Sequence, residues 1–225
     1  MADAMDSKSI SRKGVGVQVP ASAPEIADPL ARALLPVLLH RIANAAQLLS
    51  GLDALLPLGP AVLEERSGDL ASAGETVDDV GWLLALLASA SGSRLLLERR
   101  NRGGLAPLLD GVRSCLRRDG RDLAPADAPL PDLSPDVADG WQLPWAIASL
   151  LFLEGRGLAP KAALPWSLRP AGDSWSVECD ASPATDAGPS LARLLEDLPG
   201  ARFHRAGGKA SLAIPRAWLR PAGTR

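Results

Sequence analysis

Apolar residues recur at three- and four-residue steps after Asp28, and this periodicity constrains the fold more than any other feature of the chain. The members of the first run are Leu34, Leu35, Leu38, Ile42, Ala45, Leu49, Leu52 and Leu56. Such spacing places an apolar stripe along one side of a helix, here about 27 residues long. Asp28 and Pro29 are typical of a helix N-cap and first turn. Pro36 lies inside the run, where we expect a kink.

A second apolar run follows residues 57–60, whose sequence PLGP is expected to end the first helix. Its members are Leu63, Leu70, Ala73, Val77, Val80, Leu84 and Leu87, with heptad-like steps. Two long helices with a short connection predict an antiparallel helical hairpin. A single hairpin would leave an apolar face uncovered. We therefore expect a homodimer in which two hairpins form a four-helix bundle.

The remainder of the chain alternates between helix-like and strand-like segments. We expect helices at 105–118, 141–153 and 189–198, and strands at 161–169, 174–180, 201–205 and 210–215. Helices segregated from antiparallel hairpins predict a two-layer α/β sandwich, so the fold class is α+β. The expected organisation is a disordered leader at 1–27, the hairpin at 28–100, the α/β domain at 101–219 and a tail at 220–225.

The net charge of −2 gives no basic footprint for nucleic acid or for an anionic membrane. The two cysteines and two histidines lack the spacing of a metal site, so we expect no metal. No apolar run reaches about 18 residues, and the N-terminus lacks the apolar core of a signal peptide. We therefore expect a cytoplasmic protein without direct membrane insertion.

His40 is the sequence feature that bears most directly on function. His40, Asn44, Gln47 and Gly51 share one polar stripe of the first helix, away from the apolar stripe. A solvated helix face is one interpretation of this stripe. The other is a phosphoacceptor, because an exposed imidazole with an ordinary pKa near 6.5 is mostly neutral at cytosolic pH and can act as a nucleophile.

Residues 40–52, HRIANAAQLLSGL, resemble the H-box of the sensor histidine kinases whose motif is H-R-[VI]-K-N-N-L-Q-x-[IL]-S-x-L. The motif's Lys, second Asn and first Leu are replaced by alanines at 43, 45 and 46. The helical hairpin is similar to the dimerisation and phosphotransfer domain of that family. The resemblance implies that His40 accepts a phosphoryl group, that Arg41, Asn44 and Gln47 support it, and that a response-regulator receiver domain is the partner.

The second half is similar in layout to the ATP-binding domain of that family, but the nucleotide-binding residues are missing. The helix at 141–154 has no Asn to hold Mg²⁺ against phosphates. The D-x-G-x-G motif has no counterpart, and Asp186-Ala187-Gly188 is the nearest fragment. We therefore expect no cofactor and no ATP-dependent autophosphorylation.

Two functions remain open at this stage. The first is a histidine phosphotransferase that passes phosphoryl groups through His40 to or from receiver aspartates. The alternative is a non-catalytic, pseudokinase-like dimeric scaffold that binds signalling partners while His40 stays inert.

Overall fold

The computed structural model describes residues 28–90, 105–133, 142–185, 187–196 and 198–221. The expected leader at 1–27 and the expected boundary near residue 100 lie outside these residues.

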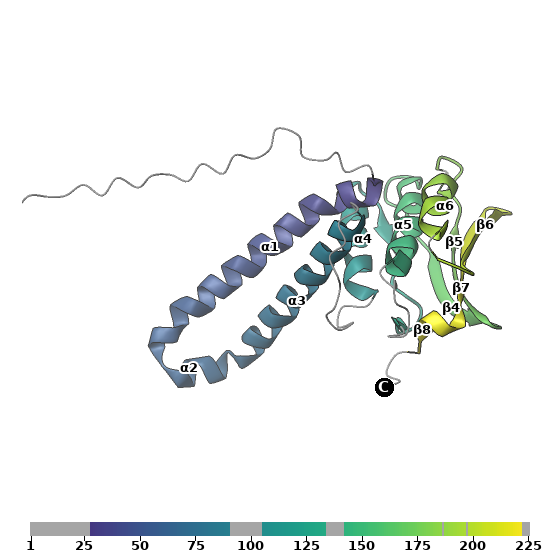
Figure 1. Ribbon diagram of the computed structural model, residues 1–225. Helices are drawn as coiled ribbons and strands as arrows, with labels where there is room; N and C mark the ends of the chain where they lie inside the picture. Colours follow the sequence, from purple (N-terminus) through teal and green to yellow (C-terminus); the bar gives the residue numbers. More distant parts are fainter. Residues whose placement is uncertain (1–27, 91–104, 134–141, 186, 197, 222–225) are drawn as a thin grey trace, which may run out of the picture.

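The N-terminal half forms the expected antiparallel hairpin, which extends away from the rest of the molecule (Figure 1). Its elements are α1 (Pro29–Leu55), a 3-10 turn (Leu56–Leu58), α2 (Pro60–Glu65) and α3 (Ser67–Ala90). The Asp28 side chain accepts a hydrogen bond from the backbone N–H of Ala31 at 2.8 Å, which caps α1. α1 stays helical through Pro36. Its length and apolar composition would suffice to cross a lipid bilayer, a test that core helices and signal sequences also pass.

The sequence pattern predicted one continuous helix for the second apolar run, and this was wrong: the run is divided into α2 and α3. The helix breaks at Arg66, where φ is −99° and ψ is 14°. Ser67 and Gly68 follow immediately, and both are weaker helix formers than Ala or Leu. Gly59 has φ +100°, a conformation that favours glycine, and it reverses the chain before α2.

The base of the hairpin packs against α4 (Ala106–Arg118) and α5 (Gln142–Arg156), and all of these elements share one hydrophobic core. Trp82 of α3 belongs to this core. The Trp145 side chain is fully buried, and its indole N–H donates to the Asp28 carboxylate at 3.2 Å. One carboxylate therefore caps α1 and ties it to α5.

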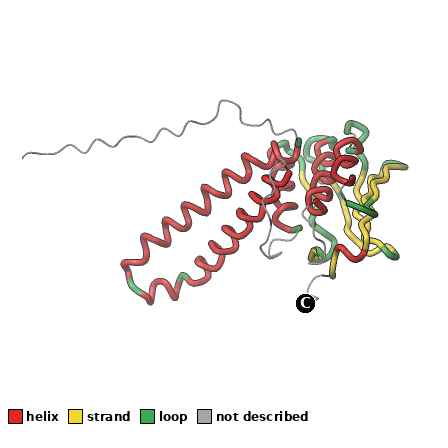
Figure 2. Tube along the Cα trace, viewed as in Figure 1, coloured by secondary structure: helices red, strands yellow, loops and turns green. Residues whose placement is uncertain are grey.

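The C-terminal half contains a four-stranded antiparallel sheet with the order β4-β5-β7-β6. Its strands are β4 (Trp166–Ala171), β5 (Ser174–Asp180), β6 (Arg202–Ala206) and β7 (Lys209–Pro215). α5 and α6 (Gly188–Glu196) form one layer of the domain, and this sheet forms the other (Figure 2). The α+β class, with a helical hairpin followed by a two-layer α/β domain, is therefore confirmed.

Short strand pairs that the sequence did not predict complete the domain. β1 (Asp122–Leu123) pairs in parallel with β3 (Ala163–Leu164), and β2 (Asp132–Leu133) pairs antiparallel with β8 (Leu219–Arg220). The strand expected at 161–169 is divided at Pro165, which has no N–H to donate to a ladder. A second 3-10 turn (Arg216–Trp218) precedes β8.

Candidate functional site

His40 lies in the middle of α1 with its side chain exposed to solvent. One turn further along, the Asn44 amide nitrogen Nδ2 lies 3.2 Å from His40 Nε2. With the amide NH₂ as the donor, Nε2 is the acceptor, which corresponds to the tautomer that carries its proton on Nδ1. Nε2 therefore lies on the outer surface of a long helix, where its lone pair accepts from Asn44.

The structure places Gln47 on the same exposed face as His40 and Asn44. Arg41 is half-buried and belongs to another face. Burial raises the pKa of Asp79 on α3, the positive charge of Arg41 partly opposes this, and nearby carboxylates add smaller increases. The Arg41 charge therefore interacts with a carboxylate of α3. The other three predicted residues, His40, Asn44 and Gln47, lie together on the exposed stripe.

Large apolar side chains are exposed along the hairpin beside this stripe. They are Leu35, Leu39, Leu48, Leu49 and Leu56 on the α1 side, and Leu70, Val77 and Leu84 on α3. The apolar run of α3, expected as one stripe, is divided between two environments. Ala73, Val80 and Leu87 are buried, whereas Leu70, Val77 and Leu84, which alternate with them along the helix, are each 43 % exposed. The hairpin therefore carries a second apolar face that the described part of the chain does not cover.

α5 occupies the position in which the resemblance implies a nucleotide-binding helix. All of its residues except Leu153 and Arg156 are buried. Its acidic residue, Glu154, has a side chain that is fully buried. Glu154 Oε2 accepts hydrogen bonds from the Ser182 backbone N–H at 2.7 Å and from the Thr185 hydroxyl at 3.3 Å. Arg205 Nη2 lies 3.5 Å from the same oxygen, and Oε1 has no hydrogen-bond partner among the residues that the structure describes.

The segment from Ser182 to Thr185 closes directly over the end of α5. The Ser182 hydroxyl donates to the carbonyl of Gly157 at 2.7 Å, and Arg205 also donates to the carbonyls of Ser182 and Thr185. A Cβ on Gly157 would lie 2.1 Å from Ser182 Oγ, so only glycine permits this approach. The Glu154 carboxylate of α5 is therefore occupied by hydrogen bonds to the loop at 182–185. Because it cannot also coordinate a metal ion there, the described residues of α5 do not fit a magnesium–nucleotide group. Asp186 of the fragment Asp186-Ala187-Gly188 lies outside the described residues.

The buried cysteines are unsuited to nucleophilic chemistry. Burial raises the pKa of the Cys115 thiol to about 11, and Arg118 and Arg41 partly oppose this. Burial, with Glu154 and Asp180, raises the pKa of Cys179 to about 12. Within the described ranges, no group of three or more His, Cys, Asp or Glu side chains could hold a metal ion. His204 is exposed on the edge strand β6, far along the chain from His40.

Sequence reasoning missed the role of Glu154. The available signal was one carboxylate in an otherwise apolar helix, which requires a buried partner. The partners come from a loop 28 to 31 positions later and from β6, so spacing could not identify them.

No protein-family model matches this sequence, and no curated protein matches it significantly. Among solved structures, the chain is similar to the Acinetobacter baumannii histidine kinase AdeS, with 12 % identity and a TM-score of 0.38. That match covers 78 % of this chain and 94 % of that one. It is also similar to a bacterial phosphotransferase, with 12 % identity, a TM-score of 0.36, and coverage of 86 % of this chain and 98 % of that one. Both likenesses are loose, and the assignment of function depends on the site itself.

Proposed function

We propose that the protein is a two-component histidine phosphotransferase, in which His40 accepts a phosphoryl group from a receiver-domain aspartate and passes it on. One observation carries the proposal: the Nε2 atom of His40 is presented on the exposed face of α1, with the Asn44 amide 3.2 Å away. A rigid helix holds the imidazole where a partner domain can approach it in line.

The proposed transfer forms one bond and breaks one. The Nε2 lone pair attacks the phosphorus of the aspartyl phosphate, an N–P bond forms, and the P–O bond to the aspartate breaks. The carboxylate leaves with the electron pair, and the imidazole can release its Nδ1 proton to water. The receiver and its Mg²⁺ stabilise the charge on the phosphoryl oxygens, so this chain supplies only the nucleophile and its orientation.

Asn44 positions the ring before transfer and must move during it. Its amide donates to the lone pair that attacks, which fixes the Nδ1–H tautomer in the resting protein. Both side chains are exposed, so a rotamer change that frees Nε2 costs little. The released amide then lies within reach of a phosphoryl oxygen, where a donated hydrogen bond favours the transition state.

The C-terminal domain supports a function without autophosphorylation. Buried Glu154 is occupied by the loop at 182–185 and by Arg205, and α5 presents no exposed metal ligand among its described residues. The proposed role of this domain is to hold the base of the hairpin, through the shared core and the contact between Trp145 and Asp28.

We also propose that a second copy of the chain covers the exposed apolar face of the hairpin. Leu70, Val77 and Leu84 are spaced by sevens, and they alternate with the buried residues of the same heptad pattern. That pattern is typical of a helix that contacts one neighbour within its own chain and another from a partner. An isologous dimer would place the same patch of each protomer on the other, forming a four-helix bundle.

The exposed apolar face also favours the alternative function, a dimeric scaffold that docks partners while His40 is inert. One experiment separates the two. Receiver domains from the same cell are labelled on their aspartate with radioactive phosphate, freed of the donor and mixed with this protein. The phosphotransferase proposal predicts that label leaves the receiver and appears on this chain, whereas Mg-ATP alone leaves no label. Binding of a receiver without loss of its label would support the scaffold instead.

A further inference from the structure

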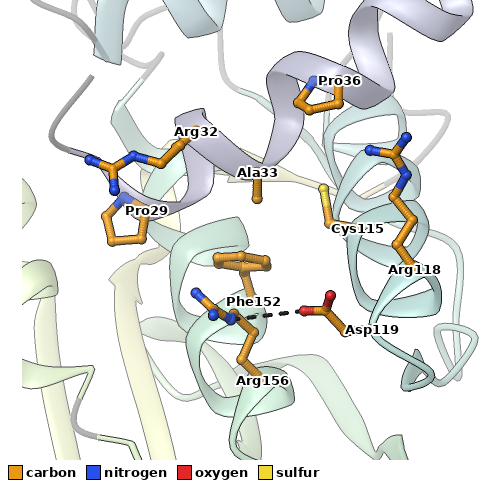
Figure 3. A pocket seen from close by; sticks show the side chains of 9 residues that line it. All are labelled: Pro29, Arg32, Ala33, Pro36, Cys115, Arg118, Asp119, Phe152 and Arg156. Carbon is orange, nitrogen blue, oxygen red and sulfur yellow. Dashed lines mark ion pairs between the residues drawn. The ribbon is translucent and has the colours of Figure 1, made fainter. Parts of the chain in front are cut away.

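A pocket of about 350 Å³ lies at the base of the hairpin, where α1, α4 and α5 meet (Figure 3). The first turns of α1 form one wall, and the last turns of α4 and α5 form the others. Its apolar lining includes Ala33, Pro36, Cys115 and Phe152. Its α1 residues Ala33 and Pro36 lie on the same face of the helix as His40, within the two turns before it, but His40, Asn44 and Gln47 do not line the pocket.

Arginines from three different helices surround this pocket: Arg32 of α1, Arg118 of α4 and Arg156 of α5 (Figure 3). The acidic residue in the lining is Asp119, and Arg156 Nε lies 4.0 Å from its carboxylate. The Arg156 guanidinium also lies over the Phe152 ring, 5.6 Å from its centre. Positive charge therefore exceeds negative charge around the opening.

Arg118 and its neighbour Arg117 have different surroundings. Arg117 Nε donates to Asp122 at 3.0 Å, outside the pocket. Arg118 lines the pocket, and among the residues that the structure describes it has no ion-pair partner. Burial raises the pKa of the Cys115 thiol, another lining residue, and the charge of Arg118 partly opposes this.

Helix dipoles explain part of this charge but not all of it. Arg118 and Arg156 end their helices, and cations are favourable at helix C-termini. Arg32 lies instead within the first four residues of α1, where the dipole disfavours a cation. The positive end of α1 adds to the field of the three side chains.

We propose that this pocket binds a small molecule through a multiply charged phosphate group of about the size of pyrophosphate. Guanidinium forks pair with phosphate oxygens bidentately, and three forks from different helices suit an anion with oxygens on every side. The volume is at the lower end for small-molecule sites, which fits a compact anion. Bound pyrophosphate would bridge the hairpin to the α/β domain through Arg32 and the other two arginines.

Calorimetric titration of the full chain with inorganic pyrophosphate, at low ionic strength, tests the proposal. The expected result is saturable binding at one site per chain. Arg118→Gln and Arg32→Gln should each weaken binding at least about tenfold, because each removes charged hydrogen bonds. Arg117→Gln is the matched control, and it should change the affinity by less than about twofold. Circular dichroism checks that each variant is folded.

Further arms of the same titration distinguish the sources of the anion. A nucleoside diphosphate that binds about as tightly as pyrophosphate supports recognition of the phosphates alone, and citrate should bind more weakly. Tighter binding of citrate, no saturable heat, or equal weakening by Arg117→Gln and Arg118→Gln would overturn the proposal. His40→Gln should bind pyrophosphate normally, so this proposal and the phosphotransferase proposal can fail separately.

Discussion

Asn44 Nδ2 lies 3.2 Å from His40 Nε2 across one turn of α1, and both side chains are exposed. With the Asn44 amide nitrogen as donor, Nε2 is the acceptor, and this is the nitrogen that we propose as the nucleophile. The pair is local to one helix, so its geometry depends on the stiffness of α1 rather than on contacts with the rest of the protein.

Replacing Asn44 with alanine should slow phosphotransfer to His40 by roughly ten- to a hundredfold, because the ring loses its orienting donor and the phosphoryl group loses a hydrogen bond. The fold should be unaffected, since the residue is exposed. Rapid-quench measurement of label transfer gives the rate. Gln47→Ala is the control. Gln47 lies about two turns of helix beyond His40, so its replacement should have a smaller effect. An Asn44→Ala protein with the wild-type rate would exclude the positioning role.

Replacing Glu154 with glutamine should lower the free energy of unfolding by about 2 kcal/mol. The glutamine amide is neutral, so the ion pair with Arg205 is lost. If its NH₂ group faces the Ser182 N–H, that N–H also loses its acceptor. Urea denaturation measures the change. Glu65→Gln, an exposed change in α2, should stay within about 0.5 kcal/mol. Equal stabilities of the two variants would show that the contacts of Glu154 contribute nothing.

Replacing Val77 with glutamate should convert a dimer into monomers, because a charge would enter the proposed apolar interface. Light scattering with size-exclusion chromatography measures the mass. Leu84→Glu should act in the same way, and Ala71→Glu, an exposed residue of α3 outside the heptad positions, should remain dimeric. A wild-type chain that stays monomeric at micromolar concentration would contradict the proposed dimer.

Stability should decrease in alkaline solution because of the two buried thiols. Burial raises the pKa of Cys115 to about 11 and that of Cys179 to about 12, from an ordinary value of 9.0. An unfolded thiol ionises first, so the stabilisation is complete below pH 9 and is lost progressively as pH rises toward 11 and 12. Urea denaturation at several pH values should show this decline. A Cys115→Ala, Cys179→Ala double variant should lose less stability over the same range, and an equal loss would exclude the thiols as its cause.

The sequence predicted the elements whose signals are local. The boundaries of α1, α4 and the hairpin strands follow from apolar spacing, a proline near a helix start and glycines at turns, such as Gly172 and Gly207 with positive φ. The exposed stripe of His40, Asn44 and Gln47 follows from helical spacing alone.

The features that the sequence did not predict depend on distant partners. The break at Arg66 reflects a balance of weak propensities, which a heptad pattern does not resolve. The parallel pairing of β1 with β3 joins segments about 40 residues apart. The Glu154 contacts and the arginine pocket exist only because α1, α4, α5 and β6 converge in space.

The most direct test of the phosphotransferase proposal is the site of the phosphoryl group after incubation with a labelled receiver domain. The proposal predicts an acid-labile, base-stable phosphate on this chain that His40→Gln abolishes and His204→Gln leaves intact. Label that survives His40→Gln, or that never appears with any receiver domain from the same cell, would contradict it.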